Sequence, residues 1–345
     1  MQIENKLTNH HTIASYFART HINNVVSQGA NEQQILAEAG LTSAQLQQLK
    51  SRVTPAQLAS IIKSCWRVNR DEFLGLTEQK VKTGMFALLA ERLITCKTLE
   101  DVIMHTIDFY NLTGDQLQCR LQQTGNNVFC YLNANFKKKT IENRPNSLLI
   151  EFLLLIFHRF SSWLIGEFIP LNKVCVQHTK PDHYEEYRLM FTCRCEFENK
   201  HNALVFDAQY LRFPVVQNAD SLSEYLDQAP LQWFKKQSYY DTYSAKVIRA
   251  LENAELETET HLDCVASTLN MSARTLRRKL TAEGCRFQQL KDNMRRDKAI
   301  KLFEQDKLTI AQISSAIGFT EVATFSRAFK QWTGVSPSTY RRYRS

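Results

Sequence analysis

Glycine and proline are scarce in this chain, which has 10 and 7 of them among 345 residues. So little of either excludes a collagen-like fibre. With 43% apolar and 23% charged residues, the composition is also unlike that of a disordered chain. The length fits two folded domains of ordinary size, each large enough to bury a core.

No pair of the nine cysteines has the C-x-x-C spacing of a zinc or redox site. Reduced structural thiols are therefore expected. Cys193 and Cys195 would place both sulfurs on one face of a strand, which is a poor geometry for a disulfide. The nine histidines form no ligand pattern either. We expect no metal site and no cofactor.

Motifs of the common enzyme classes are missing, because the sequence has no P-loop, no G-x-G-x-x-G and no G-x-S-x-G. An enzyme is therefore not expected, although these motifs do not test a site assembled from distant residues. The first residues also lack the basic and apolar segments of a secretory signal, which predicts a cytoplasmic protein.

Residues 147–168 form the one long apolar run, which raises the question of whether it spans a membrane. It contains Glu151, His158, Arg159 and Glu167. A membrane-spanning helix needs about 20 predominantly apolar residues. We expect a buried helix of a folded domain rather than a membrane span, and no membrane partner.

The excess positive charge lies in the last third of the chain. The whole sequence carries 43 basic and 35 acidic side chains, a formal net charge of +8. Residues 1–235 hold 24 basic and 23 acidic side chains, whereas residues 236–345 hold 19 and 12, a net charge of +7. This asymmetry predicts a nearly neutral module joined to one that meets a polyanion.

The first part of the chain predicts helices followed by strands. Apolar residues follow the 3.6-residue period at 13–17, 35–39, 58–66 and 86–94, and Thr54 and Pro55 suit the N-cap and first position of a helix. Alternating runs at 117–122 and 128–133, around residues 125–127, predict a hairpin. Further strands are expected at 173–178, 187–197 and 203–206, and Asp220 to Glu224 are expected to cap another helix.

Beyond residue 245 every segment is typical of helix, interrupted at Asn270, Gly284, Gly318 and Gly334. The predicted organisation is an α+β domain at 1–228, a connection at 229–244 and an all-α domain at 245–345.

The helical tail repeats itself, since residues 265–272 align with residues 313–320 at an offset of 48. Each copy holds an amphipathic helix, a turn residue that tolerates positive φ, a large apolar residue and a hydroxyl N-cap. In order after the helix, these residues are Asn270 and Gly318, Met271 and Phe319, and Ser272 and Thr320. This order is typical of a helix-turn-helix motif.

A basic helix follows each turn. If Leu276 and Leu280 face inward, Arg274 and Arg278 share an outward face flanked by Arg277. In the second copy, inward Phe325 and Phe329 leave the outer side to Val322, Ala323, Ser326, Arg327 and Lys330. A lone basic run would be read as a solvated helix face. Two capped turns with basic helices, in a segment of net charge +7, instead favour binding in the DNA major groove.

The tail resembles the AraC/XylS family of bacterial transcription regulators over about the last 100 positions. The hallmarks stand at residues 271–280, 283–284, 317–320, 325–330 and 332–337. The resemblance implies two helix-turn-helix motifs joined by a long helix at about 287–305, with their recognition helices in successive major grooves.

The same resemblance assigns base contacts to Arg274 and Arg278 in the first recognition helix and to Val322, Ala323 and Arg327 in the second. Ala323 departs from the polar residue that some members place there, so readout in the second groove would rest more on Arg327. The full set of candidate DNA-binding residues is Ser272, Ala273, Arg274, Thr275, Arg277, Arg278, Lys279, Glu321, Val322, Ala323, Thr324, Ser326, Arg327 and Lys330.

Residues 187–191, 197–207 and 210–216 look like the sensor domain of the arabinose-binding-type subgroup, which includes ornithine-utilisation and VirS-like regulators. The resemblance implies metabolite sensing and dimer formation. An amino acid, a fatty acid or another small carboxylate would fit as effector, and the pocket residues are not identified by the sequence.

Three interpretations follow from these patterns. The favoured one is a regulator, expected to be an activator, that binds promoter DNA as a homodimer, contacts RNA polymerase and responds to a small metabolite. In the second, the first domain only dimerises or binds a protein. The third is an enzyme fused to a DNA-binding module.

Overall fold

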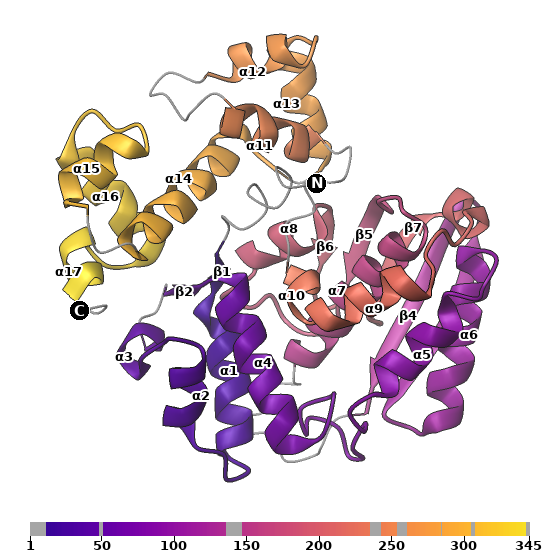
Figure 1. The fold of residues 1–345 in the computed structure, drawn as a ribbon. Coiled ribbons are helices and arrows are strands. Elements are labelled where there is room, and N and C mark those ends of the chain that lie inside the picture. Colours follow the sequence, from indigo (N-terminus) through magenta and orange to yellow (C-terminus); the bar gives the residue numbers. More distant parts are fainter. Residues whose placement is uncertain are drawn as a thin grey trace. The chain divides into compact units, whose positions relative to one another are not determined.

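The computed structural model describes residues 12–47, 51–135, 147–234, 243–253, 261–283, 285–304 and 308–342 (Figure 1). Its contacts divide the chain into two compact units. The central unit comprises residues 19–38 and 59–234, and the terminal unit comprises residues 1–18, 39–58 and 235–345.

A five-stranded sheet in the order β3-β4-β7-β5-β6 organises the central unit. Its strands are β3 (Leu117–Thr124), β4 (Asn127–Ala134), β7 (Ala203–Asp207), β5 (Leu171–Cys175) and β6 (Arg194–Glu196). Neighbours are antiparallel except for β5 and β6. The predicted hairpin is confirmed as β3 and β4, and its turn contains Gly125 at φ 58°. The strands predicted at 173–178 and 203–206 are confirmed as β5 and β7.

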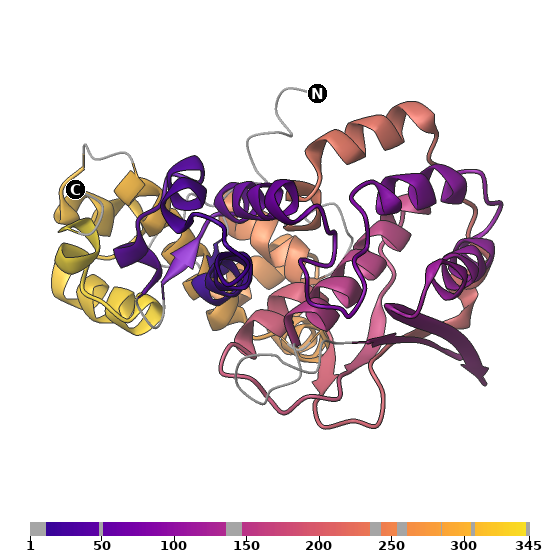
Figure 2. The same cartoon turned by 90° about the horizontal axis from the view of Figure 1, so that it is seen from below.

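The two faces of this sheet differ. Along β4, Val128, Cys130 and Leu132 are buried, whereas Phe129 and Tyr131 point to the other face and are only half-buried. Figure 2 shows the helices of the central unit on one side of the sheet. Helices therefore cover one face, and the face that carries Tyr131 is partly exposed.

Helix α7 (Ser147–Leu164) accounts for the long apolar run. By length and composition it could cross a membrane, but 72% of its residues are buried inside the fold. Its Glu151 is fully buried and accepts a hydrogen bond of 2.8 Å from the Tyr187 hydroxyl. The prediction of a buried helix is confirmed, because even the polar side chains of α7 have partners inside the central unit.

The helices predicted in the first part of the chain are present. They are α1 (Ser15–Val26), α2 (Glu32–Glu38), α4 (Pro55–Asn69), α5 (Met85–Leu93) and α6 (Leu99–Thr113), with α9 (Ala219–Gln228) later in the chain. Thr54 caps α4 as predicted, since its hydroxyl accepts from the Gln57 amide at 3.2 Å. A short 3-10 helix, η2 (Ala208–Arg212), follows β7.

Part of the strand predicted at 187–197 is wrong, because residues 185–191 form helix α8 (Glu185–Phe191) and only Arg194–Glu196 form a strand. Tyr187 and Phe191 are four residues apart and both are buried, with ring centroids 5.9 Å apart. Aromatic residues at this spacing fit one face of a helix as well as one face of a strand.

Two further local predictions are wrong in detail. The N-cap of α9 is Asn218, which accepts from the Ser221 amide, so the helix begins before Asp220. Residues 13–14 form strand β1 (Ile13–Ala14) instead of the start of a helix, because they pair with β2 (Arg52–Val53). Such pairing depends on residues far away in the sequence, which a helical period does not detect.

Within the predicted connection 229–244, Leu231–Phe234 form helix α10, and residues 235–242 lie outside the described part of the chain. Trp233 and Phe234 are buried in the central unit. Trp233 contacts Trp66 and Phe86 edge to face, with ring centroids 5.6 and 5.8 Å apart. The beginning of this stretch therefore packs as part of the central unit.

The terminal unit has two hydrophobic cores and one helix common to both. Beyond residue 243 it holds α11 (Tyr243–Asn253), α12 (Leu262–Thr268), α13 (Ala273–Ala282), α14 (Phe287–Glu304), α15 (Ile310–Ala316), α16 (Val322–Thr333) and α17 (Pro337–Arg342). Helix α14 adds Leu290 and Met294 to the core of α11–α13. It adds Ala299, Ile300 and Phe303 to the core of α15–α17. The α+β fold followed by an all-α part is confirmed.

The amino-terminal residues of this unit contact α14 directly. The Thr12 hydroxyl donates a buried hydrogen bond of 2.7 Å to Asp297, and Arg52 donates to Thr12 through its Nε, also at 2.7 Å. The same Asp297 carboxylate accepts from Arg296 at 2.9 Å. The short helix α3 (Ser43–Leu46) completes this part of the unit.

Phe325 and Val322 provide a test of this packing on one helix, since Phe325 is fully buried and Val322 is 41% exposed. Phe325→Ala should lower the free energy of unfolding by about 3–5 kcal/mol, because it leaves a cavity in the second core. Val322→Ala should change it by less than about 0.5 kcal/mol. Urea unfolding of the full chain, followed by circular dichroism, measures both, and equal losses would contradict the orientation of α16.

Candidate nucleic-acid interface

The first helix-turn-helix motif consists of α12, a turn at residues 269–272 and α13. Asn270 has a positive φ of 53°, and the Met271 amide donates to Ala266 O at 3.0 Å to close the turn. The Ser272 hydroxyl accepts from the Thr275 amide at 3.2 Å and caps α13. The predicted roles of Asn270, Met271 and Ser272 are confirmed, with Met271 packed against the first core.

Helix α13 presents its basic residues outward. Leu276 and Leu280 are buried, whereas Arg274, Arg277 and Arg278 are exposed. Ser272 is exposed, and Ala273 and Thr275 are half-buried at the start of the helix. The outer face of α13 is therefore an arginine surface held from behind by two leucines.

Lys279 differs from the three arginines. It is half-buried, and its ammonium lies 4.1 Å from the centre of the Tyr243 ring. Lys246 of α11 lies 5.1 Å from the same ring. The structure thus places Lys279 at the junction of α13 and α11 rather than with the arginines on the outer face.

The second motif repeats the same backbone geometry in α15, the turn and α16. Gly318 has a φ of 79°, and the Phe319 amide donates to Ser314 O at 3.0 Å, as in the first motif. The prediction that Thr320 caps the helix is wrong. The N-cap is Glu321, and α16 begins at Val322, because Thr320 lies in a bend one residue before the helix entry.

Helix α16 also faces outward as predicted. Phe325 and Phe329 are fully buried. Exposed residues of its other side are Glu321, Val322, Ala323, Thr324, Arg327 and Lys330, while Ser326 is half-buried. The Arg327 guanidinium lies 3.3 Å from the Thr324 hydroxyl, one turn earlier. This surface is less basic than that of α13 and has an apolar end at Val322.

Arg295 of α14 holds the second turn in place. Its guanidinium donates to Gly318 O at 3.3 Å and lies 4.8 Å from the centre of the Phe319 ring. Burial lowers the pKa of Arg295 from its ordinary value, although the group remains charged. The sequence did not identify this residue, because no local pattern shows which arginine of a long helix meets a distant turn.

Glu283 holds the first recognition helix in place. It ends α13, and its two carboxylate oxygens accept from the amides of Tyr243 and Ser244 at 2.7 and 2.8 Å. These amides begin α11, so the carboxylate caps a helix that is distant in sequence. The neighbouring hallmark Gly284 lies outside the described residues.

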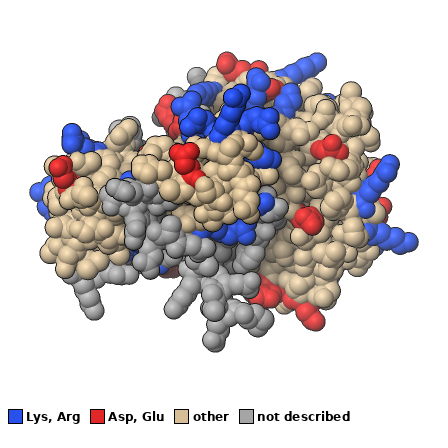
Figure 3. Space-filling model, turned by 90° about the horizontal axis from the view of Figure 1, so that it is seen from above, with Lys and Arg blue, Asp and Glu red and all other residues tan. Residues whose placement is uncertain are grey.

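Positive charge gathers over this part of the molecule. Figure 3 shows Lys and Arg side chains clustered on the face seen from above, where α12 and α13 lie at the top of Figure 1. Across the described residues, no group of three or more His, Cys, Asp or Glu side chains could hold a metal ion. The arrangement is suited to phosphates and base edges of a nucleic acid.

Comparison with known proteins gives two family matches. The family described as "Arabinose-binding domain of AraC transcription regulator, N-term" matches residues 29–215. The family described as "Helix-turn-helix domain" matches residues 265–343. Together these matches cover most of the chain.

Relatives of the chain include named transcription regulators. The ornithine utilization regulator of Pseudomonas aeruginosa is 22% identical over 330 residues, which are 94% of this chain and 95% of the relative. The transcriptional activator CfaD of Escherichia coli is 32% identical over 101 residues, 29% of this chain and only 38% of the relative. The crystal structure of the transcriptional regulator CdpR from Pseudomonas aeruginosa covers 94% of this chain and 98% of that chain, at 18% identity and a TM-score of 0.33.

Two helix-turn-helix motifs with outward-facing recognition helices define a DNA-binding transcription regulator. The chain belongs to the AraC family of these regulators and carries an arabinose-binding-type domain in its amino-terminal part. The resemblance found in the sequence is confirmed.

The contact of Glu283 with α11 can be tested by substitution. Glu283→Ala should lower the stability of the carboxy-terminal helices by about 1–3 kcal/mol, because two amides lose their acceptor. Asp263→Asn, which removes an exposed carboxylate of α12, is the matched control. Its loss of stability should be only a few tenths of the loss caused by Glu283→Ala. Thermal unfolding of the two full-length variants measures the difference, and similar melting temperatures would contradict the capping role.

Proposed function

We propose that the protein is a metabolite-responsive activator of transcription that reads two successive major grooves of promoter DNA. The observation that supports DNA reading most strongly is the pair of matching turns, at Asn270 and Gly318, each followed by an outward-facing helix. Both helices rest on cores that share α14. A single rigid helix can therefore present both recognition helices to one DNA molecule.

In this proposal Arg274 and Arg278 contact bases from α13, with Arg277 toward the phosphates and Lys279 at the edge of the interface, beside α11. Arginine reads guanine through two parallel hydrogen bonds. In the second groove, Arg327 supplies the polar contact, and the exposed Val322 and Ala323 meet thymine methyl groups. Ser272, Ala273, Thr275, Glu321, Thr324, Ser326 and Lys330 complete the proposed interface.

Residues 1–228 are proposed to sense the effector and to dimerise, residues 229–244 to connect, and residues 245–345 to bind DNA. The arabinose-binding-type domain and the name of the Pseudomonas relative, an ornithine utilization regulator, support an effector of small size. The similarity to CfaD, a transcriptional activator, supports activation, which requires contact with RNA polymerase. A cytoplasmic location follows from this role.

Arg278→Ala should weaken binding to the specific operator by about 1–3 kcal/mol and relax preference at one base pair, because a bidentate contact is lost. Arg249→Ala, on the exposed side of α11, removes the same charge outside the recognition helices. Arg249→Ala should weaken binding to specific DNA and to scrambled DNA equally.

Titrations at several salt concentrations measure both variants. The slope of affinity against salt reports the number of phosphates neutralised, so it should change with a lost phosphate contact and not with a lost base contact. If Arg278→Ala weakens binding to scrambled DNA as much as binding to operator DNA, Arg278 contacts only a phosphate.

Selection of bound DNA from a random pool should recover two conserved base clusters whose centres lie about 10 base pairs apart, one for each recognition helix. A single cluster would contradict simultaneous binding by α13 and α16. Repeating the selection with amino acids, small organic acids and fatty acids tests sensing. If none of these compounds alters DNA binding, the first domain acts by dimerisation or protein contact, and DNA reading stands.

A further inference from the structure

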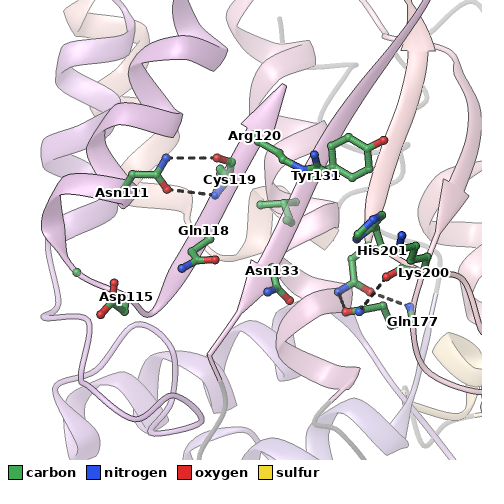
Figure 4. Close-up of a pocket in the computed structure, with 13 residues that line it drawn as sticks. Asn111, Asp115, Gln118, Cys119, Arg120, Tyr131, Asn133, Gln177, Lys200 and His201 are labelled. Carbon is green, nitrogen blue, oxygen red and sulfur yellow. Dashed lines mark hydrogen bonds between the residues drawn. The ribbon is translucent and has the colours of Figure 1, made fainter. Parts of the chain in front are cut away.

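The partly exposed face of the central sheet contains a cavity of about 830 Å³ (Figure 4). Its floor comes from β3 and β4, which carry Arg120, Tyr131 and Asn133. Its walls come from the end of α6 and from the loop that carries Lys200 and His201. The volume lies in the range of small-molecule sites.

Two basic side chains contact one aromatic ring in this cavity, and Lys200 lines the cavity beside them. The Arg120 guanidinium lies 4.0 Å from the centre of the Tyr131 ring, and the His201 ring meets the same ring edge to face at 5.4 Å. Figure 4 shows Lys200 beside His201, on the side of Tyr131 away from Arg120. Within the described parts of the chain, Arg120 and Lys200 have no carboxylate within ion-pair distance.

Amide side chains fix the walls before any ligand binds. Asn202 is 4% exposed, donates to Gln177 Oε1 at 2.8 Å and accepts from the Gln177 backbone amide at 2.9 Å. Gln177 in turn donates to Lys200 O at 3.1 Å. The loop that carries Lys200 and His201 is therefore held in position, which lowers the entropic cost of binding.

The opposite wall is fixed in a similar way. The Asn111 side chain pairs with both backbone groups of Cys119, donating at 3.3 Å and accepting at 3.4 Å. This contact ties the end of α6 to the edge strand β3. Asp115 lies on this side, and it is the one carboxylate among the described residues that line the cavity (Figure 4).

The lining selects among the possible effectors. Three basic residues against one acidic residue favour a ligand with a carboxylate. Gln118 and Asn133 add amide groups that can pair with further polar atoms of a ligand. A fatty-acid tail in the same place would cover charged and amide groups without satisfying their hydrogen bonds, which is unfavourable.

We propose that this cavity is the effector site and that it takes a small polar organic acid, with amino acids as the main class. The carboxylate binds to Arg120, His201 and Lys200, and an amino group, where present, faces Asp115. The site rests on the proposed function, because it specifies where and what the regulator senses. It adds a location and a chemical class to that function.

The experiment uses the full-length protein and a panel of L-amino acids, small dicarboxylic acids and long-chain fatty acids. Thermal shift identifies compounds that bind the folded protein. Calorimetric titration then compares the wild type with Arg120→Gln and His201→Gln. Arg92→Gln, an exposed substitution on α5 of the same unit, is the matched control. Melting temperatures without ligand verify that each variant is folded.

A polar carboxylate should bind, and each cavity substitution should weaken it about tenfold or more, as expected for a lost charge-assisted hydrogen bond. Arg92→Gln should bind like the wild type. If a compound alters DNA binding but binds both cavity variants with wild-type affinity, the site is wrong and sensing stands. A fatty acid that alters DNA binding and binds both cavity variants with wild-type affinity would also show that the proposed site is wrong. If no compound shifts the melting temperature or alters DNA binding, the sensing function fails and the site fails with it.

Discussion

Sharing of helix α14 between two hydrophobic cores is the constraint on which the DNA-reading half depends. Leu290 and Met294 belong to the first core, and Ala299, Ile300 and Phe303 belong to the second. Because buried side chains are closely packed, neither core can rotate about α14 without losing contacts. The hydrophobic interior, rather than any surface charge, therefore determines where the two basic faces point.

Two partly buried polar contacts stabilise this arrangement further. Glu283 links the end of α13 to the start of α11, and Arg295 links α14 to the turn before α16. Each contact satisfies backbone groups that would otherwise lack a partner at a helix end or in a turn. The arginines of α13 take part in neither contact, and their exposed side chains can meet a polyanion.

Local features of the DNA-binding part were predictable from the sequence, whereas long-range contacts were not. The turns at Asn270 and Gly318 and the inward positions of Leu276 and Phe325 follow from residue type and a 3.6-residue period. Helix α8 was misread because Tyr187 and Phe191 satisfy both the helical and the strand period. Asp297 binds Thr12 across 285 positions, and Arg120, Lys200 and His201 come together from separate segments, so no local pattern indicates either group.

Helix α14 also sets the rotation of one helix-turn-helix motif relative to the other about the helix axis. Its 18 residues span about 27 Å at 1.5 Å per residue. One added residue in its middle would turn one core relative to the other by about 100°, since an α-helix has 3.6 residues per turn. In the proposed mode of DNA binding, the length of α14 must therefore match the pitch of the double helix.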